Sequence, residues 1–294
     1  MRSLIAELKK RPILVSDGAW GTLLQKKGLQ PGECPELWNI DHRADVFEIA
    51  QNYIAAGADM IKTNSFGGNG IKLSHYHCTD RTLELNRAAA EISREAADTR
   101  ALVLGSMGPT GKMLVMGDIS EEELYEAFAL QARGLEQGGA DVVLLETFSA
   151  IDEAIIAVSA VRENTALEVA CTFTFEKTAA GEYRSMMGAG PATMAHELVK
   201  AGAHVIGANC GNGMERMIEI VTEQHAARPL VPIMVHANAG MPEMRDGSTT
   251  YPETPAMMAA LAPELIKAGA AIIGGCCGTT PDHIKAIATA LGKR

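Results

Sequence analysis

Short apolar runs recur along the chain, and four of them follow the same glycine-centred joint. The joint reads AAGADMIKTN at 55–64, QGGADVVLLET at 137–147, KAGAHVIGANC at 200–210 and KAGAAIIGGCC at 267–277. A glycine just beyond a helix adopts the left-handed conformation without a Cβ penalty. Each joint therefore predicts the end of one helix and the start of a strand.

Further apolar runs, which begin at Ile13, Ala101, Glu168 and Pro232, complete a set of eight predicted strands. Strands that are apolar along nearly their whole length are typical of a parallel sheet buried on both faces. The sequence therefore predicts an α/β protein in which helices alternate with the strands.

Several of the intervening helices have recognisable starts. Ser120 and Glu123 have the spacing of a capping box. Thr254–Pro255 and Thr280–Pro281 each place an N-cap residue before a proline at the first helical position. Because no linker divides the strand–helix units, we expect one domain over residues 1–294, a single (β/α)8 TIM barrel, with a doubly wound open sheet as the alternative.

Composition narrows the classes of function. Hydrophobic residues make up 47% of the 294 residues, which is enough to form the core of a globular protein of this length. A net charge of −10 without a basic stripe argues against a nucleic-acid partner. The sequence has neither a secretory signal nor an apolar stretch near the roughly 20 residues that a membrane span needs. We therefore expect a soluble cytoplasmic protein whose six cysteines serve as metal or catalytic positions sooner than as disulfides.

Polar residues gather at the predicted carboxyl ends of the strands, where barrels carry their chemistry. The first strand ends in Asp17–Gly18, the fourth in Glu146 and the seventh in His236 and Asn238. The two carboxylates could bind an amino group, exchange protons or cap backbone donors. Asn238 is either a turn residue or a carbonyl ligand for a metal, and His236 is expected to be a hydrogen-bonded interior residue.

Three cysteines also fall at strand ends, Cys210 after the sixth strand and Cys276 and Cys277 after the eighth. Three thiolates leave one position open on a tetrahedral Zn²⁺, as in catalytic zinc sites. Adjacent strand residues face opposite ways, so both could reach one ion only where the chain turns, which Gly275 and Gly278 would allow. The alternatives are packing of small buried side chains or a strained vicinal disulfide. The remaining cysteines have no partnered spacing and are expected to be packing residues: Cys34, Cys78 and Cys171.

In order and spacing these motifs resemble the homocysteine S-methyltransferase family over nearly the whole chain. The matching segments are DGAWGT at 17–22, TNSFGGN at 63–69, MGPTGK at 107–112, LLETF at 144–148, GANCGNG at 207–213, NAGMP at 238–242 and GGCCGTTPDHI at 274–284. NAGMP and GPTGK are closer to the homocysteine module of cobalamin-dependent methionine synthase than to the branch that uses S-methylmethionine or betaine. Trp20 and Ser65 depart from the pattern, where a smaller residue and a threonine are usual, and could reshape the pocket.

The resemblance implies a zinc-dependent methyltransferase that converts homocysteine to methionine. It implicates Cys210, Cys276 and Cys277 as zinc ligands, Asp17, Gly18 and Glu146 as contacts to the amino-acid end of homocysteine, and Asn238 beside the metal. A free thiol, with a pKa of about 8.5, is mostly protonated at neutral pH and is then a poor nucleophile. Zinc displaces that proton, and a zinc ion that already carries three cysteine thiolates withdraws little electron density from the bound sulfur, which therefore stays reactive.

Alternatives remain open for the methyl donor and for the class of reaction. Because the sequence contains neither a second barrel for a methylated folate nor a D-x-H-x-x-G cobalamin segment, we expect a methylcorrinoid such as methylcobalamin to arrive on a separate protein or as free cofactor. S-methylmethionine and betaine are the alternative donors. Two other interpretations are a non-catalytic zinc-binding scaffold and a Schiff-base lyase with Lys62 as nucleophile, which would need a depressed lysine pKa.

Overall fold

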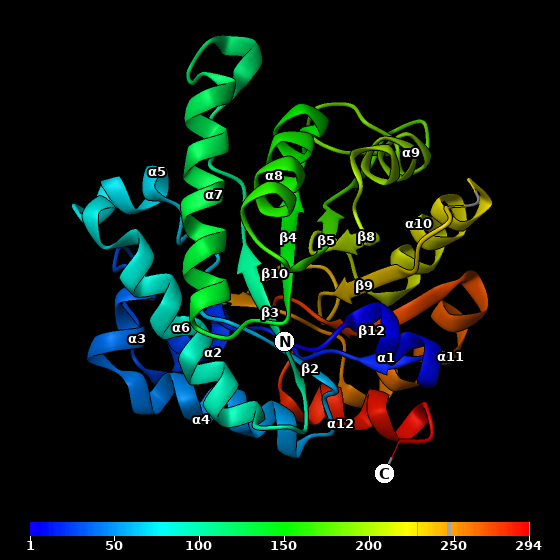
Figure 1. The fold of residues 1–294 in the computed structure, drawn as a ribbon. Coiled ribbons are helices and arrows are strands. Elements are labelled where there is room, and N and C mark those ends of the chain that lie inside the picture. The colour runs from blue at the N-terminus through cyan, green and yellow to red at the C-terminus, as the bar shows by residue number, and fades with distance from the viewer. Residues whose placement is uncertain (228, 246–247, 294) are drawn as a thin grey trace.

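The computed structural model describes residues 1–227, 229–245 and 248–293, and its centre is a ring of eight parallel strands (Figure 1). The strands are β1 (Leu14–Val15), β2 (Met60–Lys62), β3 (Leu102–Met107), β4 (Val142–Phe148), β5 (Glu168–Phe173), β8 (Val205–Asn209), β9 (Ile233–Ala237) and β12 (Ala270–Gly275). Hydrogen-bonded neighbours follow the order β1-β12-β9-β8-β5-β4-β3-β2. A parallel bridge between Ser16 and Met60 joins the two end strands. The sheet is therefore closed, so the predicted barrel is confirmed and the open sheet is excluded.

Helices surround the strands (Figure 1). The longer ones are α4 (Arg43–Ala55), α6 (Thr82–Ala97), α7 (Glu121–Gln137), α8 (Ile151–Asn164), α9 (Pro191–Ala201), α10 (Met214–Ala226), α11 (Pro255–Ala268) and α12 (Pro281–Ala290). The loops carry the short helices α2 (Gly21–Lys27), α3 (Trp38–Asp41) and α5 (Gly70–Leu73), and the 3-10 turns η1 (Pro35–Leu37), η2 (Ser74–Tyr76), η3 (Thr79–Arg81) and η4 (Leu114–Met116). They also carry two small hairpins, β6–β7 (Glu176–Lys177, Tyr183–Arg184) and β10–β11 (Glu243–Arg245, Ser248–Thr250). No helix in the described ranges has the length and apolar character to cross a membrane.

The four glycine joints have the backbone that the sequence predicts. Gly57, Gly139, Gly202 and Gly269 have φ values of 94°, 93°, 97° and 118°, in the left-handed region. Each lies between a helix and the next barrel strand. The repeated joint therefore sets where four of the strands begin.

The predicted helix starts are confirmed as well. The Ser120 hydroxyl accepts a hydrogen bond from the Glu123 N–H at 3.2 Å, and Glu123 Oε2 accepts one from the Ser120 N–H at 2.9 Å, which closes a capping box at α7. Thr254 caps α11 by accepting from the Met257 N–H at 3.4 Å. Thr280 occupies the N-cap of α12. Local sequence thus determines where these helices leave the barrel rim.

The amino-terminal end of the barrel is closed by apolar side chains. Helix α1 (Leu4–Lys10) lies in front of the strands in Figure 1. Its residues Leu4 and Leu8 join a buried cluster with strand residues such as Leu14, Met60 and Leu102. A larger apolar cluster joins the strands to the outer helices. Because apolar residues fill these regions, the polar strand-end residues are left for the opposite end, the mouth of the barrel.

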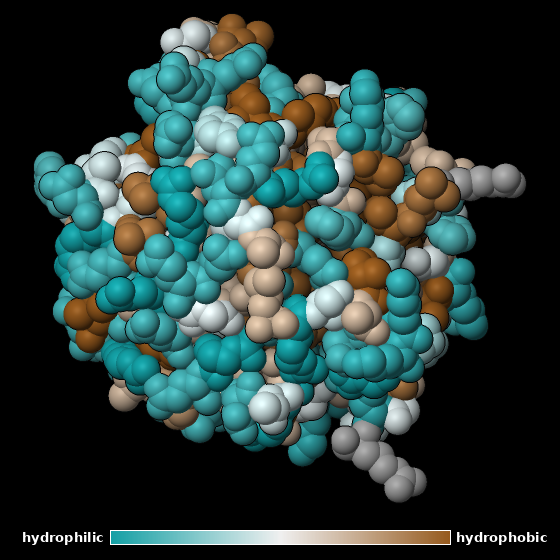
Figure 2. Space-filling model, in the orientation of Figure 1, coloured by the Kyte–Doolittle hydropathy of each residue, from teal (hydrophilic) through white to brown (hydrophobic). Residues whose placement is uncertain are grey.

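Long connections follow β1, β2, β3, β5 and β9, as predicted, and they surround the mouth. The loop between β3 and α7 projects furthest in Figure 1. Its tip is apolar, because Val115 is 72% exposed and Met116 is 70% exposed, and Figure 2 shows hydrophobic side chains at this projection. The mouth therefore combines a polar interior with an apolar outer rim.

Candidate functional site

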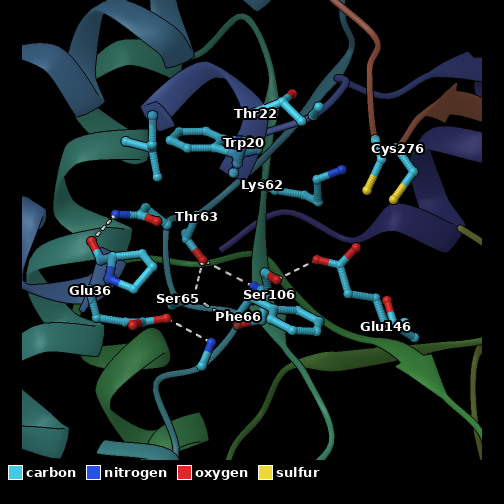
Figure 3. A pocket seen from close by; sticks show the side chains of 18 of the residues that line it. Trp20, Thr22, Glu36, Lys62, Thr63, Ser65, Phe66, Ser106, Glu146 and Cys276 are labelled. Atoms are coloured by element: carbon cyan, nitrogen blue, oxygen red, sulfur yellow. Dashed lines mark hydrogen bonds between the residues drawn. The ribbon is translucent and has the colours of Figure 1, made fainter. Parts of the chain in front are cut away.

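A cavity of about 410 Å³ lies at the mouth of the barrel. The loops after β1 and β2 form one side, and residues at the ends of several strands form the other (Figure 3). The lining residues that bear on the chemistry are Trp20, Glu36, Lys62, Thr63, Ser65, Phe66, Ser106, Glu146, Thr147, Cys210, Cys276 and Cys277. The cavity thus brings together the three strand-end cysteines and one of the two predicted carboxylates.

The three cysteines form a cluster at one end of this cavity. The Sγ atoms of Cys210, Cys276 and Cys277 all lie within 4.8 Å of one another, and those of Cys210 and Cys277 are 3.8 Å apart. All three are free thiols, so the vicinal disulfide alternative is wrong. A tetrahedral zinc with Zn–S bonds of ~2.3 Å places its sulfur ligands about 3.8 Å apart. The sulfur positions therefore fit a zinc ion.

A turn immediately after β12 lets the two adjacent cysteines face the same point. The Cys276 carbonyl accepts hydrogen bonds from the Thr279 N–H at 3.1 Å and the Thr279 hydroxyl at 2.7 Å. Gly278 has φ of +81°, and a Cβ on Gly275 would lie 2.3 Å from Thr279 Oγ1. The chain therefore turns at the flanking glycines, which is the condition that the sequence sets for Cys276 and Cys277 to reach one ion.

The third cysteine is held in an uncommon backbone conformation. Cys210 has φ of +60° and its neighbour across the cavity wall, Thr147, has φ of +66°. The Asn209 amide fixes this wall, because its Oδ1 accepts from the Thr147 N–H and the Thr172 hydroxyl and its Nδ2 donates to Thr147 Oγ1, each at 2.7 Å. Left-handed non-glycine residues persist only where surrounding contacts enforce them, often at functional sites. In the sequence, the position of Asn209 directly before Cys210 is the available signal, and it does not by itself indicate this role.

The thiols interact strongly with one another. Hydrogen bonds with Cys210 and Cys277 raise the pKa of Cys276 well above its usual value, whereas hydrogen bonds from Cys210 and Cys276 lower the pKa of Cys277 to about 3. The Tyr251 ring packs against the turn, since a Cβ on Gly278 would lie 2.3 Å from its Cγ. A cation would relieve the repulsion that opposes ionisation of all three sulfurs, as expected for a metal centre.

Two buried residues from the end of β9 lie near this cluster. The Asn238 N–H bonds to the Asn212 carbonyl, and the next residue donates to the Cys277 carbonyl, so Asn238 lies between the cysteine-bearing loops. Its Oδ1 has no hydrogen-bond partner among the described residues, which suits a carbonyl oxygen beside a cation. The hydrogen bonds predicted for His236 are wrong, because neither ring nitrogen has a partner in the described part of the chain. Burial lowers the pKa of this imidazole well below its usual value, so it is neutral.

Asp17 and Gly18 are placed differently from Glu146. Glu146 lines the cavity, whereas Asp17 and Gly18 are not among the described residues that do. Asp17 is fully buried, and its Oδ2 accepts hydrogen bonds from the Lys62 N–H and from Trp20 Nε1, both at 2.7 Å. A Cβ on Gly18 would lie 2.6 Å from Thr279 Oγ1, so this glycine is packed against the cysteine turn. The unusual Trp20 therefore has a structural role, because its indole N–H donates a hydrogen bond to the Asp17 carboxylate.

Lys62 and Glu146 project toward the same part of the cavity from β2 and β4 (Figure 3). Burial alone would lower the pKa of Lys62, but the charges of Asp17 and Glu146 outweigh it and raise the pKa above its usual value. Burial raises the pKa of Glu146, although Lys62 and a hydrogen bond from the Ser106 hydroxyl oppose the rise. A Schiff-base nucleophile needs a neutral amine, so the lyase interpretation of Lys62 is disfavoured.

Ser65, the second departure from the family pattern, is also in the lining. Its hydroxyl donates to the Ser106 carbonyl at 2.7 Å and lies 2.5 Å from Thr63 Oγ1. A serine lacks the methyl group that a threonine would place at this wall. The other three cysteines, Cys34, Cys78 and Cys171, are buried outside the cluster, as predicted.

Known proteins resemble this chain both in sequence and in fold. A family model described as homocysteine S-methyltransferase matches residues 14–291. Methionine synthase of Mycobacterium leprae (strain TN) is 34% identical over 311 residues, which cover 99% of this chain and 25% of that protein. Methionine synthase of Mycobacterium tuberculosis is 34% identical over 307 residues, which cover 98% of this chain and 25% of that protein. The chain therefore spans about a quarter of the length of these relatives.

Among solved structures, the metallated form of the homocysteine methyltransferase MmuM from Escherichia coli is similar, with a TM-score of 0.80 and 23% identity. The similarity covers 97% of this chain and 99% of that chain. The apo form of the same protein gives a TM-score of 0.77. At this level of identity the likeness concerns the fold, and it agrees with the closed barrel described above.

Proposed function

This chain belongs to the homocysteine S-methyltransferase family, and we propose that it methylates the sulfur of homocysteine, forming methionine, at a zinc ion bound by Cys210, Cys276 and Cys277. The observation that carries the proposal is the cluster of three free thiols in the wall of the mouth cavity. Three cysteine ligands leave one tetrahedral position for the thiol of the acceptor.

The proposed chemistry requires an ionised acceptor thiol. A zinc ion held by the cluster would lower the pKa of that thiol, so that the thiolate predominates at neutral pH. The thiol proton leaves to solvent, and a sulfur lone pair forms the new S–CH3 bond. The donor keeps the electron pair of the bond that breaks. The contribution of this chain is to hold the sulfur in line with the donor methyl group.

In the proposal, the residues around the cysteine cluster bind and position the acceptor. Glu146 faces the cavity and would bind the ammonium group of homocysteine. Asn238 would offer its unpartnered carbonyl oxygen beside the metal. Asp17 and Gly18 would act from behind the lining, Asp17 by holding Trp20 and Lys62 in place and Gly18 by allowing close packing against Thr279.

We propose a methylcorrinoid such as methylcobalamin, free or carried on a separate protein, as the donor. The NAGMP and GPTGK segments and the similarity to methionine synthases support this donor over S-methylmethionine or betaine. The loops after β3 and β5 also border a second cavity of about 110 Å³ with apolar side chains, among them Met113, Val115, Met186 and Met187. This exposed apolar rim is suited to contact with a large donor or its carrier.

The test is methionine formation from homocysteine by the zinc-loaded protein, with methylcobalamin, S-methylmethionine and betaine assayed in parallel. Cys210→Ser removes one proposed ligand. Cys78→Ser is the matched control, since Cys78 is buried outside the cluster and its thiol donates to the Tyr76 carbonyl at 3.2 Å, a hydrogen bond that serine can keep.

We expect turnover with methylcobalamin by the unaltered protein and by Cys78→Ser, and none by Cys210→Ser. Turnover with S-methylmethionine or betaine alone would reassign the donor. Tight zinc binding without methionine from any donor would refute the proposed reaction and favour the scaffold interpretation.

A further inference from the structure

Lys62 is a buried cation to which the proposed methyl transfer assigns no direct role. Its side chain is 5% exposed and forms part of the cavity wall. Its Nζ lies 3.3 Å from Asp17 Oδ1 and donates to the Gly275 carbonyl at 3.4 Å. An ammonium group has three N–H donors. Within the described residues, the third donor of Lys62 has no partner, so it is available to a molecule in the cavity.

Glu146 supplies an opposite charge to the same space. Lys62 and Glu146 enter the cavity from different strands beside Cys276 (Figure 3). In the described part of the chain no ion pair joins them directly, although each shifts the pKa of the other. Two buried, opposite charges that face one cavity without pairing are complementary to a small zwitterion.

Both oxygens of Asp17 already have partners, which disfavours this residue as a second site for an ammonium group. Its Oδ2 already accepts from Trp20 and from the Lys62 backbone, and its Oδ1 faces the Lys62 ammonium. The charge of Lys62 would repel a ligand ammonium group that approached on this side. The same charge would attract a carboxylate. The two sides of the cavity therefore differ in sign, negative at Glu146 and positive at Lys62.

We propose that Lys62 binds the carboxylate of the acceptor, opposite the ammonium group that the proposed function gives to Glu146, and so makes the cavity select thiols that carry this carboxylate. This inference rests on the proposed function in two respects: the acceptor thiol lies at the cysteine cluster and its ammonium group lies at Glu146. Lys62 is then a specificity-determining residue. Asp17 positions it by pairing with Nζ, and Trp20 completes the hydrogen bonding of Asp17.

The test compares the binding of three thiols to zinc-loaded protein by isothermal titration calorimetry in the absence of any methyl donor. Homocysteine carries both charged groups, 3-mercaptopropylamine lacks the carboxylate and 4-mercaptobutyrate lacks the ammonium group. A charge-assisted hydrogen bond in a buried site corresponds to a preference of about ten- to 100-fold. We expect the unaltered protein to prefer homocysteine over 3-mercaptopropylamine by a factor in this range.

The variants separate the two charged contacts. Lys62→Met should remove the preference for homocysteine over 3-mercaptopropylamine and leave the affinity for the amine nearly unchanged. Glu146→Gln should instead reduce the preference for homocysteine over 4-mercaptobutyrate. Lys62→Met leaves the Asp17 charge buried without its cation, which is destabilising. The double variant Asp17→Asn/Lys62→Met removes both charges and should show the same loss of carboxylate preference.

Equal affinity of the unaltered protein for homocysteine and 3-mercaptopropylamine would overturn the inference, as would equal weakening of both ligands by Lys62→Met. Failure of homocysteine to bind at all would overturn it too. Because the comparison needs no donor, a protein that discriminates between the thiols but forms no methionine would refute the proposed reaction and leave the role of Lys62 standing.

Discussion

Gly278 connects the backbone turn to the cysteine cluster, and its replacement by alanine tests that connection. The residue follows Cys277 directly and has φ of +81°. A Cβ at this position would lie 2.3 Å from Cγ of the Tyr251 ring. Gly181, in the β6–β7 hairpin, is a matched control: its φ is +84°, and among the described residues a Cβ there would meet nothing within 4 Å beyond its chain neighbours. Both alanine variants impose the same backbone strain, but only one produces a collision.

The expected magnitudes follow from these geometries. A non-glycine residue in the left-handed region costs about 1–2 kcal/mol, which is the whole expected effect of Gly181→Ala. Carbon atoms normally approach to about 3.5 Å, so the Tyr251 ring or the turn must move by about 1.2 Å in Gly278→Ala. Overpacking of this kind adds about 1–3 kcal/mol. Zinc sites tolerate only about 0.2 Å of deviation in bond length, so we expect zinc affinity to fall tenfold or more.

Denaturant unfolding of the metal-free proteins measures the free energies, and competition with a chromophoric chelator measures zinc affinity. Gly278→Ala should be less stable than Gly181→Ala and should bind zinc more weakly, whereas Gly181→Ala should bind zinc as the unaltered protein does. Equal stability and equal zinc affinity in the two variants would refute the claim that the Gly278 turn sets the positions of the cysteine sulfurs.

Three further predictions concern the cavity wall, its buried carboxylate and the metal. Asn209→Leu removes three hydrogen bonds to Thr147 and Thr172, and unpaired buried groups cost about 1–3 kcal/mol each; a change in unfolding free energy below about 0.5 kcal/mol would contradict the role given to this amide. Burial raises the pKa of Glu146 above its usual 4.5, so its contribution to stability is complete below that value and is lost as pH rises through the raised pKa. Thermal unfolding of metal-free protein between pH 4.5 and 8 should therefore show the unaltered protein losing stability relative to Glu146→Gln, and parallel profiles would argue against the raised pKa. Zinc at 100 times its Kd should stabilise the folded protein by about 2.7 kcal/mol. Calorimetry should therefore show that zinc raises the Tm of Cys78→Ser and raises the Tm of Cys210→Ser much less. An equal rise in Tm for the two variants would place the metal elsewhere.

The barrel could be predicted because its signals are local. Left-handed glycines such as Gly57 and Gly202 end helices through their own backbone freedom, and capping residues such as Ser120 act within one helical turn. A closed parallel barrel then places all strand ends at one mouth. For that reason the sequence could bring Cys210 together with Cys276 and Cys277, which are more than 60 residues away.

The details that the sequence did not predict depend on side chains from separate strands. Asp17 lies behind the cavity because Trp20 and Lys62 both bond to it, and the spacing of polar residues does not reveal such a network. The pKa of Lys62 rises because Asp17 and Glu146 outweigh its burial, which depends on the tertiary positions of three strands. The residue type of His236 alone predicts hydrogen bonds, yet its neighbours in the described structure offer it no partner.

Zinc K-edge X-ray absorption of the zinc-loaded protein, measured before and after addition of homocysteine, tests whether the three cysteines and the acceptor thiol share one zinc ion. We expect three sulfur ligands at about 2.3 Å with one lighter ligand in the resting protein, and four sulfur ligands once homocysteine is bound. Fewer than three sulfur ligands at the outset, or an unchanged sulfur count at saturating homocysteine, would contradict activation of the acceptor thiol at this cysteine cluster.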